Sequence, residues 1–472
     1  MVIKKIETAL SSFEIFLLFE KRRNCVFFDS AMTHEALGRF SIVAFDPEIT
    51  FLAKNGAVSI RGRENADIEP ADPFDALDAL LERYRMDYDG PLPFIGGAAG
   101  YFSYDMRHYL EKLSRGAVDD VGLPDCFFGI YDGSIIIDHE KGEVWVAAAG
   151  IFNDPEAWAA AVTAAVASGS CCGRTPHGLP QESAGDRTED GCASAGISGR
   201  LYANIGKEEY IEAIGSIRDH IKAGDIYQVN MTVRFEGDCS QAPIELYRRL
   251  RSINPAPFAC YLDFDAGHVI CSSPERFVRI RNGRAQTRPI KGTRPRGATA
   301  EEDLRYREEL VGSEKDRAEL LMIVDLERND LGRVCKAGSV RVTELFALEE
   351  YASVYHLVAT VEGELEDGID AVGCLKAMFP GGSITGAPKI RAMEIIDKLE
   401  PTARGIYTGS TGYIGFNGHS DFNIAIRTIV LKDGRAYFQA GGGIVWDSEA
   451  ESEYDELRCK ADALMRAARL KP

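Results

Sequence analysis

The chain has 472 residues, of which 45 % are hydrophobic and 27 % are charged. These proportions are typical of a folded globular protein and exclude disordered and collagen-like classes. The 54 basic and 73 acidic side chains give a net charge of −19. We therefore expect no nucleic-acid partner, because a net anion repels phosphate. No apolar run is long enough to span a membrane, and acidic residues interrupt the only candidate signal-peptide core, so we expect a cytoplasmic protein without membrane contact.

The N-terminal third predicts a β-rich region that ends in a helix. Strand-like segments recur at 25–29, 40–45, 135–137 and 144–148, and residues 153–168 form an Ala-rich helical pattern. Asn55-Gly56 and Asp132-Gly133 predict hairpin turns, because these dipeptides accept the backbone conformation that such turns need. We expect a first region over residues 1–167.

Residues 168–200 are rich in Gly, Ser, Pro and charge, which predicts a flexible linker or loop before a third region at 201–472. The linker contains a G-x-C-x-G pattern at 169–173, which also occurs around cysteine nucleophiles. No strand precedes it and no amphipathic helix follows it, so we interpret it as a loop. The 11 cysteines are scattered without a C-x-x-C pair, which favours inert thiols in a reducing compartment.

A first hairpin in the C-terminal region is predicted to turn at Asn282-Gly283. Its register places Glu275 opposite Ile290, next to Lys291, at the open end of the hairpin. The two charged side chains could form a surface ion pair, which register alone favours, or they could serve a buried site.

Two further hairpins turn at Asp433-Gly434 and near Asn417-Gly418. They bring Arg427 and Tyr407 to the same end as a run of three glycines, Gly441, Gly442 and Gly443. Glycine lets a ligand approach the backbone closely, and arginine suits a carboxylate. The sequence therefore predicts a pocket for a small carboxylic acid.

Two acidic pairs lie at helical spacing, Asp316 with Glu319 and Glu453 with Glu456, on helices predicted at 315–331 and 449–470. Acidic positions on a helix are usually solvated. An apolar run at 320–324 follows Glu319, however, so we expect that helix to be buried all round and its carboxylate to need a cation. The two pairs could hold one Mg²⁺. His356 is equally compatible with a buried structural role and with a functional one.

Seven segments in this order and spacing resemble one enzyme family. They are 224–230, 272–277, 289–294, 316–333, 386–391, 426–428 and 453–460. Together they resemble the chorismate-utilising enzymes, which include component I of aminodeoxychorismate synthase and the anthranilate, isochorismate and salicylate synthases. Segments 38–41 and 96–105 extend the resemblance more weakly into the first region. It implies an α+β fold of large antiparallel β-sheets packed as a sandwich with helices outside, with residues 201–472 as the chorismate-binding catalytic region.

Two positions sort the activities of this family. In members that resemble isochorismate and salicylate synthases, a lysine stands at the position of Gln228. In members that resemble anthranilate synthases, an alanine stands at the position of Lys291. The pattern here is similar to that of aminodeoxychorismate synthase component I, which implies conversion of chorismate and ammonia to 4-amino-4-deoxychorismate, a precursor of 4-aminobenzoate and folate. The chain has no credible glutaminase, so we expect a glutamine amidotransferase subunit as partner.

The resemblance also implies a role for each candidate residue. Lys291 is the nucleophile that attacks C2 of chorismate, and Glu275 is the general acid. Mg²⁺ is the implied cofactor. The implied metal ligands are Glu319 and Glu456, supported by Glu453 and Asp316; the implied substrate contacts are Tyr407, Arg427, Gly441, Gly442, Gly443, Lys460, His356 and Ser383.

Two other functions stay open at this point. Anthranilate synthase component I is the nearer alternative, although Lys291 argues against it. A non-catalytic chorismate or amino-acid sensor is the more distant one. The first region could bind tryptophan, but Phe28-Asp29-Ser30 departs from the Leu-Glu-Ser element that anthranilate synthases carry there.

Overall fold

The computed structural model describes residues 1–32, 37–169, 199–351 and 354–471. The expected linker at 168–200 and the G-x-C-x-G pattern lie mostly outside these residues. Eight cysteines fall within them, and all eight are free thiols. No helix of the described chain is long and apolar enough to cross a membrane.

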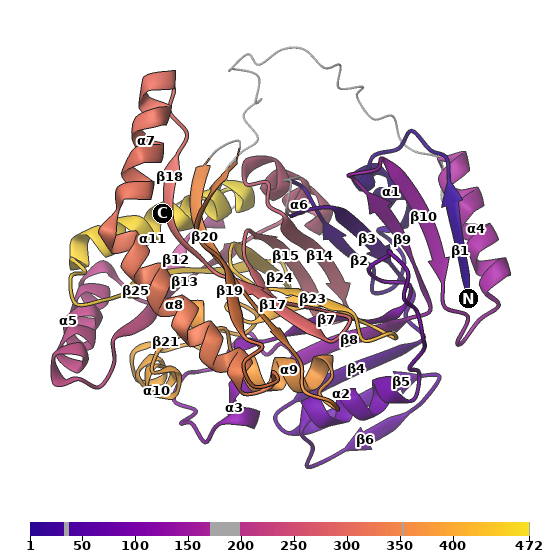
Figure 1. The fold of residues 1–472 in the computed structure, drawn as a ribbon, viewed down its shortest axis with the longest axis horizontal. Coiled ribbons are helices and arrows are strands. Elements are labelled where there is room, and N and C mark those ends of the chain that lie inside the picture. Colours follow the sequence, from indigo (N-terminus) through magenta and orange to yellow (C-terminus); the bar gives the residue numbers. More distant parts are fainter. Residues whose placement is uncertain (33–36, 170–198, 352–353, 472) are drawn as a thin grey trace.

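Most of the described strands belong to two large sheets (Figure 1). In spatial order, the first sheet contains β1 (Val2–Ile6), β10 (Glu143–Ala148), β9 (Gly133–Asp138), β3 (Phe40–Ala44), β2 (Val26–Asp29), β14 (Phe258–Phe264), β15 (Gly267–Ser273), β24 (Thr428–Lys432), β25 (Arg435–Ile444), β13 (Gln228–Asp238) and β12 (Tyr202–Ala203), with β21 (Gly386–Ala387) also paired to β13. The second contains β18 (Ile290–Pro295), β20 (Val354–Glu364), β17 (Arg284–Arg288), β16 (Arg276–Arg281), β23 (Ser420–Asn423), β22 (Ser410–Gly415), β7 (Gly97–Phe102), β8 (Cys126–Tyr131), β4 (Ile49–Lys54), β5 (Ala57–Gly62) and β6 (Ala66–Ile68), with β19 (Arg341–Glu350) also paired to β20.

Eleven α-helices of the described chain accompany the sheets: α1 (Ser12–Phe19), α2 (Pro73–Glu82), α3 (Arg107–Leu110), α4 (Pro155–Ser168), α5 (Lys207–Ala223), α6 (Pro243–Ile253), α7 (Ala300–Gly312), α8 (Glu314–Gly332), α9 (Ala371–Met378), α10 (Lys389–Leu399) and α11 (Ala450–Ala468). Two 3₁₀ turns, η1 (Tyr104–Met106) and η2 (Gly382–Ile384), and a short parallel pair, β11 (Gly199–Arg200) with β26 (Leu470–Lys471), complete the fold. The predicted helices at 153–168, 315–331 and 449–470 are therefore confirmed to within two residues at each end.

The large sheets pair their strands antiparallel, and side chains from both share a core. Val26 and Cys260 of the first sheet and Tyr101 and Phe127 of the second belong to one buried apolar cluster. The expected α+β fold with packed antiparallel sheets is confirmed. Both sheets also combine strands from residues 1–167 and 201–472, because β2 pairs with β14 and β7 pairs with β22.

The predicted hairpin at Asp132-Gly133 is wrong. β8 ends just before this dipeptide and β9 begins at Gly133, but the two strands lie in different sheets, so the chain crosses between sheets there. The Asp132 carboxylate instead accepts hydrogen bonds from the backbone N–H groups of Ile151, Phe152 and Asn153. An Asp-Gly turn signal does not reveal this long-range partner. The turns at Asn55-Gly56, Asn282-Gly283 and Asp433-Gly434 are confirmed.

Candidate active site

Glu275 and Lys291 are close enough for the charge of Lys291 to lower the pKa of Glu275, although Lys291 lies in β18, which pairs with β20 and not with β16. Arg279 faces Gln286 where β16 pairs with β17, and a bulge nearer the open end moves Arg276 opposite Arg288. Glu275 directly precedes β16 and is 6 % exposed, so the surface ion pair is wrong. Burial raises the pKa of the Glu275 carboxyl, while a hydrogen bond from Ser383 and the charge of Lys291 lower it less. The acid form is therefore favoured, as a proton donor requires.

The Lys291 ammonium lies beside the backbone of η2. Its Nζ is 3.5 Å from the carbonyl oxygen of Ser383. The protein atoms around the ammonium lower the pKa of Lys291; the negative charges of Glu319 and Glu275 oppose this, and Lys460 adds to it. Burial thus favours the neutral amine, which is the nucleophilic form.

The two acidic residues on α8, Asp316 and Glu319, have different neighbours. Asp316 is paired with Arg294 at 3.1 Å, and a Cβ at Gly292 would lie 3.0 Å from the Asp316 side chain. Burial raises the pKa of Glu319, and the negative charges of Asp316 and Glu453 raise it further. The positive charges of Lys291 and Lys315 lower it by less. The expectation that this helix is buried all round is wrong, because Leu321 is exposed and the helix presents only one face to the core.

The acidic pair on α11 faces the same lysines. Glu456 is 2.6 Å from Lys460 and keeps more than half of its side chain exposed. Its partial burial would raise the pKa of Glu456, but the ion pair with Lys460 outweighs this and lowers it. Glu453 is buried and accepts a hydrogen bond of 2.7 Å from Ser448.

These four carboxylates offer a donor set suited to a hard cation. Over the described ranges, no three His, Cys, Asp or Glu side chains already converge closely enough to hold a metal. Glu319 is nevertheless repelled by Glu453 across the site, and a cation between them would relieve that repulsion. Oxygen ligands of this kind fit Mg²⁺, which needs only one or two carboxylates from the protein.

The three glycines of β25 lie against close neighbours within the protein, and the backbone contact at Gly441 leaves no room for a Cβ. A Cβ at Gly441 would lie 2.3 Å from the Met231 carbonyl oxygen, and one at Gly442 would lie 3.2 Å from Glu453. A Cβ at Gly443 would lie 2.7 Å from the side-chain nitrogen of Gln228. Gln228 is fully buried, and neither its amide nitrogen nor its amide oxygen has a hydrogen-bond partner among the described residues. Sequence reasoning used Gln228 only to sort activities, whereas the fold places its unsatisfied amide inside the site.

Arg427 and Tyr407, which the sequence predicted to line a carboxylate pocket with the three glycines, lie near each other, and the charge of Arg427 also acts on His356. Arg427 has a positive φ of 52° and donates to the carbonyl oxygen of Lys460, while the Lys460 Nζ lies 3.1 Å from the Gly441 carbonyl oxygen. Burial raises the pKa of Tyr407 to about 12. Burial also lowers the pKa of His356 to about 4, and the charge of Arg427 contributes to this; His356 is bonded to Thr293 at 2.9 Å. His356 is therefore neutral near pH 7.

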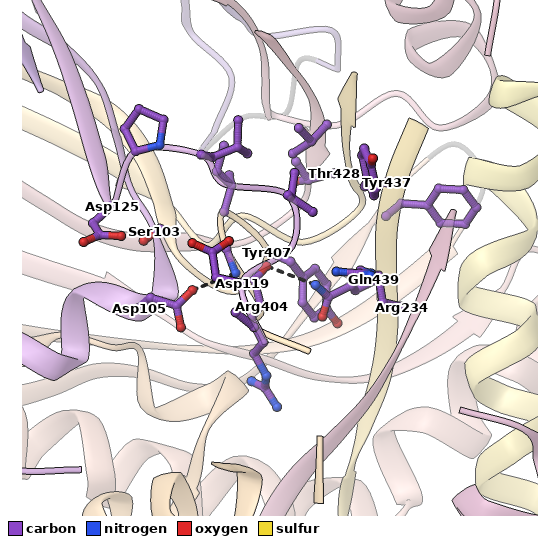
Figure 2. Close-up of a pocket in the computed structure, with 18 of the residues that line it drawn as sticks. Ser103, Asp105, Asp119, Asp125, Arg234, Arg404, Tyr407, Thr428, Tyr437 and Gln439 are labelled. Carbon is purple, nitrogen blue, oxygen red and sulfur yellow. Dashed lines mark hydrogen bonds between the residues drawn. The ribbon is translucent and has the colours of Figure 1, made fainter. Parts of the chain in front are cut away.

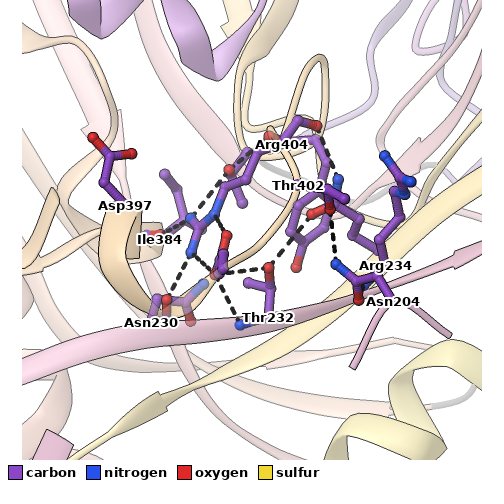
Figure 3. Close-up of polar contacts among 12 residues, drawn as sticks. Asn204, Asn230, Thr232, Arg234, Ile384, Asp397, Thr402 and Arg404 are labelled. Carbon is purple, nitrogen blue, oxygen red and sulfur yellow. Dashed lines mark hydrogen bonds and ion pairs between the residues drawn. The ribbon is translucent and has the colours of Figure 1, made fainter. Parts of the chain in front are cut away.

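A buried ionic network beside Tyr407 fixes the position of this part of the site (Figure 3). Arg404 pairs with Glu400 at 2.7 Å and donates to the carbonyl oxygens of Asn230 and Ile384. Glu400 in turn accepts from the backbone N–H of Thr232. The network ties β13, which carries Gln228, to η2, which carries Ser383. The sequence analysis did not find it, because the Glu400–Arg404 pair, four residues apart, is joined to partners near 230 and 384 that only the fold brings together.

Two cavities flank the site without enclosing the Glu275–Lys291 pair. One of about 40 Å³ lies beside Tyr407 and Arg404, with Asp105, Ser103 and Gln439 in its wall (Figure 2), which is room for little more than a water molecule. The other, of about 820 Å³, is lined by Phe28, Asp29 and Ser30 and by residues of β16 and β23. The tripeptide that departs from the anthranilate synthase element therefore faces a large cleft.

The sequence and fold match known proteins over nearly the whole chain. Residues 23–466 match the family described as chorismate binding enzyme. Aminodeoxychorismate synthase component 1 of Bacillus subtilis is 39 % identical, covering 96 % of this chain and 93 % of that protein. Anthranilate synthase component 1 of Thermus thermophilus is 42 % identical, covering 92 % and 89 %. The crystal structure of anthranilate synthase component I from Streptococcus pneumoniae matches with a TM-score of 0.78 at 34 % identity, covering 92 % of this chain and 94 % of that one.

The two packed antiparallel sheets hold a buried acid, Glu275, a partly buried amine, Lys291, and a basic residue, Arg427. The match over 444 positions, 23–466, makes the assignment: the chain belongs to the chorismate binding enzymes. The comparisons include both aminodeoxychorismate and anthranilate synthases at similar identity, so they establish a chorismate-utilising enzyme without selecting the member.

Proposed function

We propose that the chain is component I of an aminodeoxychorismate synthase. The observation that carries this proposal is the environment of Lys291: its Nζ lies 3.5 Å from the Ser383 carbonyl oxygen, the surrounding protein lowers the pKa of its amine, and burial raises the pKa of the neighbouring Glu275 carboxyl. A lysine in that state can form a covalent bond to substrate, whereas a charged surface lysine cannot.

The reaction then proceeds in two balanced substitutions. The Lys291 amine bonds to C2 of chorismate, the two conjugated ring double bonds shift to C1=C6 and C4=C5, and the C4–oxygen bond breaks as Glu275 gives its proton to the departing water. Ammonia next bonds to C4, both double bonds shift back, and the C2–nitrogen bond to Lys291 breaks. Lys291 and Glu275 are restored when the surplus proton of the ammonia-derived nitrogen returns through them. The product is 4-amino-4-deoxychorismate, and the lysine directs ammonia to C4.

The remaining residues bind and orient the substrate. Arg427, Tyr407 and the Gly441–Gly443 backbone hold the enolpyruvyl carboxylate, and Lys460, His356 and Ser383 lie around the ring. Mg²⁺, when bound by Glu319 and Glu456 with Glu453 and Asp316 in support, would neutralise the ring carboxylate. Lys460 forms an ion pair with Glu456, so its ammonium competes with that cation for the Glu456 carboxylate. Ammonia comes from a separate glutamine amidotransferase, consistent with relatives whose names include "component 1".

One experiment separates this function from its nearest alternative. The purified chain is incubated with chorismate, Mg²⁺ and an ammonium salt, and the products are identified by mass spectrometry. We expect aminodeoxychorismate. Anthranilate as the main product would instead assign the chain to anthranilate synthase component I, an alternative supported by the 42 % identity to the Thermus thermophilus protein.

A further inference from the structure

The loop that carries Tyr407 is held in a strained conformation. We call residues 404–409, between α10 and β22, the Tyr407 loop. Thr408 in this loop has a φ of 58°, in the left-handed region that a β-branched residue rarely adopts. Its hydroxyl donates to the Tyr407 carbonyl oxygen at 2.6 Å and accepts from the Arg404 guanidinium at 3.3 Å. Such a conformation persists only where the surrounding structure over-determines it.

The first region supplies part of that support through η1. The Asp105 carboxylate accepts a hydrogen bond of 2.9 Å from the backbone N–H of Gly405 (Figure 2). The Gly405 carbonyl oxygen accepts one of 2.7 Å from the N–H of Tyr104. Both backbone groups of one loop residue are therefore bonded to η1. At the other end of the loop, a Cβ at Gly409 would lie 2.2 Å from the carbonyl oxygen of Phe102, so the loop is also in backbone contact with β7.

The Tyr104 ring adds a side-chain contact between η1 and the loop. The Arg404 guanidinium lies 4.7 Å from the centre of this ring, and the Arg107 guanidinium lies 4.4 Å from it. Tyr104 is fully buried, and its hydroxyl has no hydrogen-bond partner among the described residues. The ring therefore supports the loop by packing, whereas Asp105 supports it by a hydrogen bond.

The strength of that hydrogen bond depends on pH. Burial raises the pKa of Asp105 to about 6; Arg107 and the Gly405 N–H lower it, and the charges of Asp125 and Asp119 raise it. Other titratable side chains nearby are Lys54, Arg234, Arg404, Tyr407 and Tyr437 in the wall of the cavity of about 40 Å³, with Asp397 and Glu400 paired to Arg107 and Arg404. A carboxylate is a stronger acceptor than the protonated acid. The bond to Gly405 therefore weakens as the pH falls through about 6.

We propose that Asp105 is a positioning residue for Tyr407, an inference that rests on the proposed contact between Tyr407 and the enolpyruvyl carboxylate of chorismate. Asp105 acts through the backbone of Gly405, two residues before Tyr407. Without that bond the strained loop relaxes, and the phenol of Tyr407 no longer meets the substrate carboxylate. Binding of chorismate is then weakened. The chemistry at Lys291 and Glu275, which lie on other elements, is not.

Two variants of Asp105 separate its two contributions. Asp105→Ala removes the acceptor, whereas Asp105→Asn keeps an oxygen for Gly405 and removes the charge. Consumption of chorismate is followed with Mg²⁺ and ammonium salt from about pH 5 to about pH 8. At the upper end we expect KM for chorismate to rise about tenfold in Asp105→Ala and about threefold in Asp105→Asn, with kcat within about twofold of the parent. The KM of the parent should rise as the pH falls through about 6, and Asp105→Asn should lack that rise.

Asp119→Ala is the matched control, because Asp119 lines the same cavity but is paired with Lys54. It should leave KM nearly unchanged. Equal rises in KM for Asp119→Ala and Asp105→Ala would overturn the proposal, since they would indicate the charge of the cavity and not the bond to Gly405. An unchanged KM in Asp105→Ala would also overturn it, as would a fall in kcat as large as the rise in KM.

Circular dichroism reports whether each variant folds. If Asp105→Ala does not fold, the pH dependence of KM in Asp105→Asn decides the question, and a dependence equal to that of the parent would refute the proposal. Consumption of chorismate does not depend on which product forms. Anthranilate as the product would therefore refute the proposed function alone.

Discussion

Two polar clusters in this protein contain similar residues but differ in whether their polar groups have partners within the protein. The Arg404–Glu400 pair is closed, because its charges and the backbone groups of Asn230, Thr232 and Ile384 satisfy one another. The Glu275–Lys291 pair is open, since burial shifts the pKa of both groups toward neutrality, and the Gln228 amide beside Gly443 has no partner among the described residues. Closed clusters hold a shape, whereas open ones retain binding capacity for a substrate.

Lys291→Ala should have the largest effect on catalysis. Removing the nucleophile should lower kcat about a thousandfold or more, which is ~4 kcal/mol of lost transition-state stabilisation. Steady-state kinetics with ammonium salt measures the loss, and circular dichroism checks the fold. Lys315→Ala removes an exposed lysine 4.0 Å from Glu319 and should change the rate only slightly. A Lys291→Ala enzyme that makes aminodeoxychorismate at a comparable rate would eliminate the covalent route.

Arg404→Met should have the largest effect on stability. It leaves Glu400 buried without its charge partner, and we expect a loss of about 3–5 kcal/mol in the free energy of unfolding. Arg328→Met, which breaks the exposed pair with Asp325, should cost at most about 1 kcal/mol. Urea denaturation measures both. Equal costs for the two variants would mean that the closed cluster does not hold the fold.

Glu319→Gln and Glu456→Gln test the proposed metal site. Each removes one anionic ligand, so turnover at low Mg²⁺ should fall about a hundredfold or more. Titration with Mg²⁺, followed by activity and by calorimetric binding of the metal alone, separates weaker binding from lost chemistry. Asp325→Asn, an exposed carboxylate on the same helix, is the control. Near-normal activity of either Gln variant at low Mg²⁺ would exclude that residue as a ligand.

The pH profile of kcat at saturating ammonia should be bell-shaped and narrow. The active form has a neutral Lys291 and a protonated Glu275. Protonation of Lys291 therefore lowers the rate at low pH, and ionisation of Glu275 lowers it at high pH. The lowered pKa of Lys291 and the raised pKa of Glu275 both increase the fraction of enzyme in the active form between pH 4.5 and pH 10.5. Glu275→Gln should remove the fall in rate at high pH. A fall at high pH that persists in Glu275→Gln would show that Glu275 is not the proton donor.

Gln228→Leu should have the smallest effect on stability and the opposite sign. It replaces two unsatisfied buried amide atoms with a side chain of similar size, so the free energy of unfolding should rise by about 1 kcal/mol. Activity should fall, since the open cluster loses a polar contact for substrate. Thermal denaturation and kcat/KM measure the two effects, and a loss of stability without a loss of activity would make Gln228 structural.

Local patterns in the sequence predicted much of the fold. The Asn282-Gly283 and Asp433-Gly434 turns set the registers of β16 with β17 and of β24 with β25 near each turn, because a two-residue turn leaves little freedom in pairing. A bulge then shifts the first register before Glu275, and Lys291 lies in β18, which pairs with β20. Helices α8 and α11 follow from their periodicity. The predicted hairpin at Asp132-Gly133 was wrong because a dipeptide indicates only a local backbone preference. Here the Asp132 carboxylate accepts hydrogen bonds from backbone N–H groups at 151–153, which that preference does not reveal.

The sequence by itself determined the family, the residue types of the site and the strand registers near each two-residue turn. Tertiary structure alone decided which of those groups are buried. The pKa shifts of Glu275 and Lys291, the unsatisfied amide of Gln228 and the Arg404–Glu400 support depend on the packing of β13, η2, α8 and α11 against one another. Burial and electrostatic coupling are properties of three-dimensional neighbours, and residues that are hundreds of positions apart in the chain supply them.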